Sequence, residues 1–274
     1  MSDEWLLGLP NELALQRAVM RGLIEQAKAN DRIRLVVVGC SIGRGNADAL
    51  SDVDAYVGVA DDGDWRASLP AIDAGLPKIG PILDLHHQFL SDAKRADYRH
   101  TFIQYEDGVQ VDLVVSPAFA HRAPDREWVV LYDPDGRVSG APEQRDPTSE
   151  QVRTWMFGGL GRLSAAAKYL ERGSLWEALT VLEAARADLW RLWAVAIGAP
   201  DPQYGVTAVL DLPEARVLPG MERTIARLDH VSLRDASIAC LDLLIQVWSR
   251  ASNGEPLPPF AERVRTQLLG RDSA

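Results

Sequence analysis

The chain has 274 residues, a net charge of −10, and an ordinary balance of 47% hydrophobic and 25% charged residues. That length fits one large or two modest domains, and the acidic balance disfavours nucleic acid as a partner, because such binding depends on neutralising phosphates. With two cysteines, no basic leader and no long uncharged apolar run, we expect no disulfide scaffold, signal peptide or membrane span, and a place in the cytoplasm.

The net negative charge comes from one part of the chain. Residues 151–274 hold 14 acidic and 14 basic side chains, so the whole net charge of −10 belongs to residues 1–150. A field of this sign attracts cations, either metal ions or organic amines, although acidity can also serve solubility alone.

The first half of the sequence alternates between helical and strand patterns. Four consecutive apolar, β-favouring residues, Leu35 to Val38, indicate a buried strand. In chain order, we expect a helix from an N-cap at Asn11 to about Asn30, strands at 33–38 and 53–59, a short helix at 65–74 interrupted by Pro70, and a strand at 82–89.

The clearest local signal is a β-hairpin. Asp107-Gly108 separates two strand-like runs at 100–106 and 109–115, and this dipeptide is typical of tight hairpin turns. A last strand at 128–132 leads into residues 133–149, which are rich in proline, glycine and charge and are interpreted as a linker.

The second half reads as helical throughout. Apolar residues at helical spacing from Val152 to Leu170 predict a long helix that ends at Gly173. Ser174 and Glu177 fit a capping box for the next helix, and further helices are expected near 213–229, 234–251 and 259–269. The predicted fold is therefore a mixed α and β domain over residues 1–140, of α+β class, followed by an α-helical bundle domain over 141–274.

The candidate chemistry lies in three carboxylates. Asp52 and Asp54 follow a strand and the small-residue turn 39–45, and Asp112 falls inside the second arm of the hairpin. Because residues two apart on a strand point to the same side, Asp52 and Asp54 can aim at one metal ion, which an acid from a neighbouring strand can complete. This arrangement favours a Mg²⁺ site beside a nucleoside triphosphate.

These motifs resemble the nucleotidyltransferase fold of the DNA polymerase β superfamily, and within it the aminoglycoside nucleotidyltransferases. The resemblance implies a mixed-sheet catalytic domain followed by a helical bundle. It also implies Mg²⁺-dependent transfer of a nucleoside monophosphate to a hydroxyl of a small molecule. The expected transferred group is AMP, with ATP as its donor. An aminoglycoside acceptor would make this an antibiotic-resistance activity.

The same resemblance assigns roles to the acidic residues. Asp52 and Asp54 match metal ligands, and Asp112 matches an acid that shares a metal and acts as general base on the acceptor hydroxyl. A carboxylate beside a metal is a weak base, so its position must compensate for its low basicity.

Further residues match nucleotide contacts of the family. Ser41 and Arg44 match groups that bind the donor phosphates, and Lys168 and Tyr204 match donor contacts by position only. Where the family has glycine before the serine, this sequence has Cys40, which would be strained if the site requires a positive φ.

Two other functions remain open at this stage. An enzyme of the same fold that modifies a protein or an RNA would need only a minimal domain, which the long helical half disfavours. A non-catalytic nucleotide-binding protein would not need the three acids. The acceptor, the nucleotide and the number of subunits are not set by the sequence.

Overall fold

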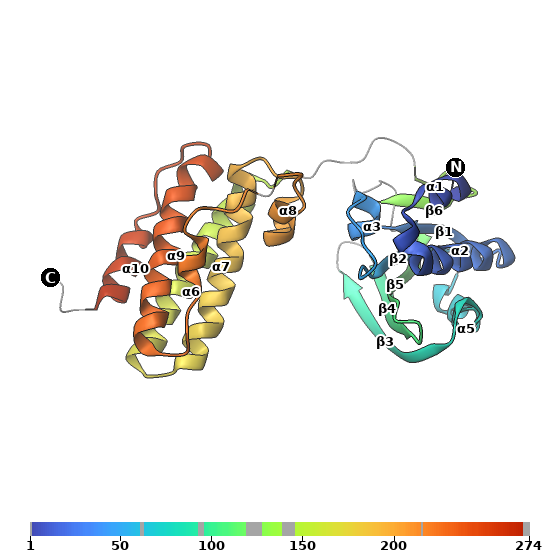
Figure 1. Cartoon of the computed structure of the whole chain (residues 1–274), viewed down its shortest axis with the longest axis horizontal. Coiled ribbons are helices and arrows are strands. Elements are labelled where there is room, and N and C mark those ends of the chain that lie inside the picture. Colours follow the sequence, from blue (N-terminus) through green and yellow to red (C-terminus); the bar gives the residue numbers. More distant parts are fainter. Residues whose placement is uncertain are drawn as a thin grey trace. The chain divides into compact units, whose positions relative to one another are not determined.

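The computed structural model describes residues 2–60, 63–92, 96–118, 128–138, 146–214 and 216–270. The chain divides into two compact units, residues 1–144 and residues 145–274, drawn in Figure 1. The first unit contains a β-sheet with helices, and the second is helical. The expected α+β class with a following helical bundle is confirmed.

The sheet of the first unit has six strands in the order β3-β4-β5-β2-β1-β6. Only the central pair, β2 and β5, is parallel, and the other neighbours run antiparallel. The strands are β1 Ile33–Val38, β2 Val53–Val59, β3 Ile82–Asp92, β4 Ala96–Tyr105, β5 Gln110–Pro117 and β6 Val129–Tyr132.

The strands follow the apolar runs of the sequence closely. The expected strands at 33–38 and 53–59 are β1 and β2 with the same limits, because each is buried along nearly its whole length. The predicted hairpin is also present, and Gly108 has the positive φ of 97° that its turn requires. β3 is three residues longer than expected and ends at Asp92.

The helices of this unit depart more from expectation. Asn11 is the first residue of a 3₁₀ turn and not a helix cap, and α1 was not predicted. Pro70 does not interrupt a helix but stands in the first turn of a new one, where proline is tolerated. The elements are α1 Ser2–Gly8, η1 Asn11–Leu13, α2 Ala14–Ala29, α3 Cys40–Arg44, η2 Trp65–Ser68, α4 Leu69–Asp73 and α5 Leu76–Ile79.

The two faces of the sheet are packed differently. One face forms the main core with α2, α4 and α5, with buried residues such as Val57, Leu113 and Ile103. The other face, which we call the carboxylate face, carries Asp54, Asp112 and the residues in register with them. Near β1 and β6 it holds a small apolar cluster that includes Tyr56, and toward β3 it carries His100 and Gln104 on either side of Phe102.

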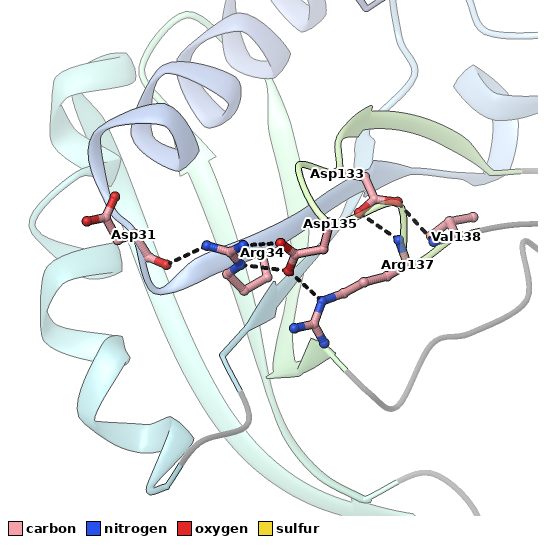
Figure 2. A network of polar contacts seen from close by, with 6 residues as sticks. All are labelled: Asp31, Arg34, Asp133, Asp135, Arg137 and Val138. Carbon is pink, nitrogen blue, oxygen red and sulfur yellow. Dashed lines mark hydrogen bonds and ion pairs between the residues drawn. The ribbon is translucent and has the colours of Figure 1, made fainter.

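The segment after β6 is fastened to β1 by an ion network (Figure 2). Arg34 of β1 donates through Nε to Asp135 Oδ2 at 2.9 Å, and Arg137 Nε reaches the same oxygen at 2.9 Å. The backbone N–H groups of Arg137 and Val138 donate to the two oxygens of Asp133. Residues 133–138, predicted as linker, therefore form an ordered turn, and residues 139–145 lie outside the described residues.

The second unit is a bundle in which α6, α7, α9 and α10 pack together (Figure 1). The capping box predicted at Ser174 is wrong, because Ser174 makes no capping hydrogen bond, and one forms instead between Thr148 and Gln151. The helix predicted at 213–229 is also wrong, since the described part of this segment has only the short turn η5. The elements are α6 Ser149–Glu171, α7 Leu175–Ala196, η4 Pro202–Tyr204, α8 Val206–Leu210, η5 Met221–Thr224, α9 His230–Ala251 and α10 Phe260–Leu269.

None of the helices described in either unit is long and apolar enough to cross a membrane.

Candidate active site

The three acids singled out in the sequence come together on the carboxylate face. Asp54 on β2 lies directly opposite Asp112 on β5 in the parallel pair, and Asp52 immediately precedes β2. One carboxylate oxygen from each of the three lies within 4.8 Å of the others, and all three residues are half-buried. Three convergent hard oxygen donors are the ligand type that Mg²⁺ prefers.

The turn after β1 brings small residues to the same place. The N–H of Gly39 donates to the carbonyl of Asp54 at 3.0 Å, which extends the β1–β2 pairing to this acid of the cluster. Residues 40–44 then form the single-turn helix α3 in place of the predicted open turn, and Gly45 ends it with φ of 77°. Ser41 is half-buried in this turn, and Arg44 is its last residue.

Cys40 occupies a left-handed backbone conformation. Its φ is 50°, a region that costs a residue with a side chain of this kind about 1–3 kcal/mol. The strain expected for a cysteine at this position is therefore present. Its thiol donates a hydrogen bond to the Asp54 carboxylate, so the side chain that causes the strain also contacts the acid cluster.

The electrostatics of the cluster centre on Asp54. Burial raises the pKa of Asp54 above its usual range, and the negative charges of Asp52 and Asp112 raise it further. The Cys40 thiol and the Arg44 guanidinium act in the opposite direction, but the net shift is upward. The three partly buried carboxylates therefore repel one another, and the positive charge of Arg44 does not fully compensate this repulsion. A divalent cation bound between them would reduce it.

The comparison with known proteins places this site in a family. The sequence model of streptomycin adenylyltransferases matches residues 15–204, which include all three acids. The chain belongs to the streptomycin adenylyltransferase family. It is a nucleotidyltransferase, and a nucleoside triphosphate is its co-substrate.

Solved structures similar to this family member include an aminoglycoside 6-adenyltransferase from Bacillus subtilis, with 17% identity over 93% of this chain and 98% of that one and a TM-score of 0.43. A nucleotidyltransferase-like protein from Exiguobacterium sibiricum has 16% identity over 86% of this chain and 76% of that one, with a TM-score of 0.40. No curated protein matches the chain in sequence.

Sequence reasoning missed two residues of this adenylyltransferase-family site. On β4, Nε2 of His100 lies 3.4 Å from Oδ1 of Asp112. On α2, the buried Gln16 donates from Nε2 to the carbonyl of Ser51 at 2.9 Å, which fixes the chain just before Asp52. A polar residue inside the apolar stripe of a helix was a usable signal for Gln16, whereas nothing in the sequence marked His100.

Lys168 and Tyr204 belong to the second unit of the family member. Lys168 is exposed on α6, over the ring of Tyr169, and lines a hollow of about 410 Å³ with Ser164 and Gln267. Tyr204 is 50% exposed at the end of η4, beside α7 and α8. The hollow lined by Lys168 therefore lies between α6 and α10, whereas Tyr204 lies beside α7 and α8. The two predicted donor contacts do not share a site in this unit.

Proposed function

We propose that this chain transfers AMP from ATP to a hydroxyl group of a cationic small molecule of the aminoglycoside type, in a Mg²⁺-dependent reaction. The observation that carries the proposal is the convergence of Asp52, Asp54 and Asp112, each with a carboxylate oxygen within 4.8 Å of the others. Membership in the streptomycin adenylyltransferase family supports both the nucleotide and the acceptor class.

The residues present fit a divalent metal ion. The donors are three carboxylates whose oxygens converge within 4.8 Å of one another, and the pKa of Asp54 is raised by burial and by its acidic neighbours. Asp52, Asp54 and Asp112 would hold the ion. Bound there, Mg²⁺ would neutralise negative charge on the phosphate oxygens of the donor.

The side chains of the protein then accept the proton and bind the phosphates. The acceptor hydroxyl oxygen forms a bond to the α-phosphorus of ATP, the bond from that phosphorus to the β-phosphate oxygen breaks, and pyrophosphate leaves. Asp112 accepts the hydroxyl proton, because its carboxylate on β5 lies next to the site where the metal ion and the phosphates would bind. Ser41 and Arg44 bind the phosphates, with Arg44 supplying a fixed positive charge near Asp54.

The acceptor class follows from charge. The whole net charge of −10 lies in residues 1–150, the part of the chain that holds the acid cluster. A field of this sign concentrates a polycationic acceptor near the site and disfavours an anionic one such as RNA. Lys168 and Tyr204 remain proposals for donor contacts supplied by the second unit.

The test is pyrophosphate release by the full chain with ATP, Mg²⁺ and a panel that includes streptomycin and other aminoglycosides, with mass spectrometry of the acceptor. We expect release and an added AMP for at least one member. Asp112→Asn should reduce the rate by about 10²–10⁴-fold. Asp84→Asn is the matched control, because Asp84 is an exposed acid on the same face at the edge strand β3, and it should leave the rate unchanged.

Absence of release with every acceptor would contradict the proposed acceptor class. Release that survives Asp112→Asn would contradict the role given to Asp112. An equal loss in Asp84→Asn would show that general negative charge, and not the acid cluster, is responsible.

A further inference from the structure

His100 lies beside Asp112 on the carboxylate face. In the antiparallel β4–β5 pair, Phe102 is opposite Asp112 and His100 is opposite Val114. These four side chains share one face, and His100 is diagonal to Asp112. Nε2 of His100 is 3.4 Å from Oδ1 of Asp112, and the two side chains are 31% and 35% exposed.

The oxygen that His100 approaches has no other partner. Oδ1 of Asp112 is inaccessible to solvent and accepts no hydrogen bond from the part of the chain that the structure describes. A buried acceptor left in this state is costly, and buried polar atoms in folded proteins are nearly always satisfied. Among the described residues, Nε2 of His100 lies 3.4 Å from this atom, and an imidazole N–H can act as the missing donor.

We propose that His100 is a positioning residue, which donates a hydrogen bond from Nε2 to Oδ1 of Asp112. The proposal rests on the function proposed for Asp112 above. The bond fixes the orientation of the carboxylate, so that its other oxygen faces the acceptor hydroxyl and the acid cluster. Carboxylates that bind metals are themselves usually held by hydrogen bonds of this kind.

The separation of 3.4 Å is slightly longer than an ordinary hydrogen bond, whose usual range is about 2.7–3.2 Å. Such contacts in enzymes without substrate are often long and shorten in the substrate complex. The gap to the usual range is about 0.2 Å, and the His100 side chain is 31% exposed, so it is not locked in a closely packed core.

The other histidines of this sheet differ in their surroundings. His87 points to the helix-covered face, where Nδ1 lies 3.0 Å from Thr101 Oγ1. His86 is on the carboxylate face but is exposed on β3 and pairs in register with Phe102, one strand further from Asp112 than β4 is. His86 therefore provides a matched control that shares the face, the residue type and the sheet.

The test compares His100→Ala, His100→Gln, His100→Asn and His86→Ala in the full chain. A glutamine amide nitrogen can stand where Nε2 stands, whereas that of asparagine stands nearer to Nδ1. We expect His100→Ala to lower kcat by about 10–100-fold while the KM for ATP stays within about twofold, since the donor contacts are intact. His100→Gln should recover most of the activity, and His100→Asn should not.

A second readout does not depend on turnover. Mn²⁺ alone, followed by the electron paramagnetic resonance signal of the free ion, should bind His100→Ala about tenfold more weakly than the wild type. Binding to His86→Ala and His100→Gln should stay within about threefold of the wild type. Thermal unfolding of each variant separates these effects from loss of folding, and the comparison of glutamine with asparagine holds even if the alanine variant is unstable.

The positioning role is overturned if His100→Ala keeps both kcat and Mn²⁺ affinity, or if glutamine is no better than asparagine. It is also overturned if His86→Ala is impaired as strongly as His100→Ala. If the wild type binds Mn²⁺ but releases no pyrophosphate, the proposed function fails, and the Mn²⁺ series alone decides the role of His100. If the wild type is active and the His100 variants are unaffected, the proposed function stands and the positioning role fails.

Discussion

Asp54 in the first unit and Asp188 in the second are two acids whose pKa is raised, and burial is the main cause for both. Their neighbours differ. Asp188 on α7 is hydrogen-bonded to the guanidinium groups of Arg162 and Arg191, whereas Asp54 stands against Asp52 and Asp112. An upward pKa shift alone therefore does not identify a functional acid, and the sign of the surrounding charge separates the two cases.

Asp54→Asn gives the largest expected effect and tests the functional side of this comparison. Loss of a metal-binding carboxylate should lower the rate of adenylyl transfer by about 10³-fold or more. In metal-free buffer its thermal stability should equal or exceed that of the wild type, because one member of a like-charged group is removed. Rate assays and thermal unfolding with a chelator measure the two effects, and a marked loss of stability would place Asp54 with the structural acids.

Asp188→Ala tests the structural side. Breaking a buried pair costs about 3–5 kcal/mol, but both arginines are more than one-third exposed and recover hydration, so we expect a loss of about 2 kcal/mol. Urea unfolding measures it. Asp242→Ala breaks the pair with Arg265 at 2.8 Å, in which the acid is 41% exposed where Asp188 is 3% exposed, and should cost less than about 1 kcal/mol. Equal losses of stability in the two variants would contradict the structural role given to Asp188.

Substitution of the strained Cys40 beside the acid cluster should change the free energy of unfolding by a smaller amount. Cys40→Val should destabilise the chain by about 1–3 kcal/mol, because a β-branched side chain is poorly accommodated at a φ of 50°. Cys40→Gly should be neutral or stabilising by up to about 1 kcal/mol, since relief of strain offsets the lost hydrogen bond to Asp54 and the greater freedom of the unfolded chain. Urea titrations of both variants check the order, and a glycine variant less stable than the valine variant would contradict it.

The ion network of Figure 2 gives the smallest effect and a defined pH window. Hydrogen bonds from Arg34 and Arg137 lower the pKa of Asp135 to about 2. An acid with a depressed folded pKa stabilises the fold above its unfolded value of about 3.9, and this contribution is lost as the pH falls from about 4 to about 2. Asp135→Asn should flatten the fall of stability in this window, and an unchanged pH profile would contradict the assignment.

The sequence was most informative where the signals are local. The limits of β1 follow from its apolar run and those of β2 from a mostly apolar one that contains Asp54, and the hairpin follows from Asp107-Gly108. The convergence of the acids could be anticipated from spacing and family resemblance, but not the parallel register that sets Asp54 opposite Asp112. That register depends on pairing between distant segments, which no short pattern encodes.

The misses have physical reasons as well. Ser174 has the right residue type for a cap, but its side chain makes no hydrogen bond to the helix, and local chemistry alone does not decide this. Residues 213–229 contain two prolines, which oppose a continuous helix more strongly than the apolar spacing favours one. His100 was missed because its importance depends on which residue lies diagonally across β4 and β5.

The parallel pairing of β2 with β5 also bears on how the enzyme is made. Asp54 and Asp112 meet only after a loop of about 60 residues closes, and contacts of such long range form slowly. β3 and β4 lie between them in sequence but on the far side of β5 in the sheet, so β2 and β5 pair directly across the closed loop. The chain therefore acquires its complete set of three converging carboxylates only when the sheet is assembled through its fifth strand.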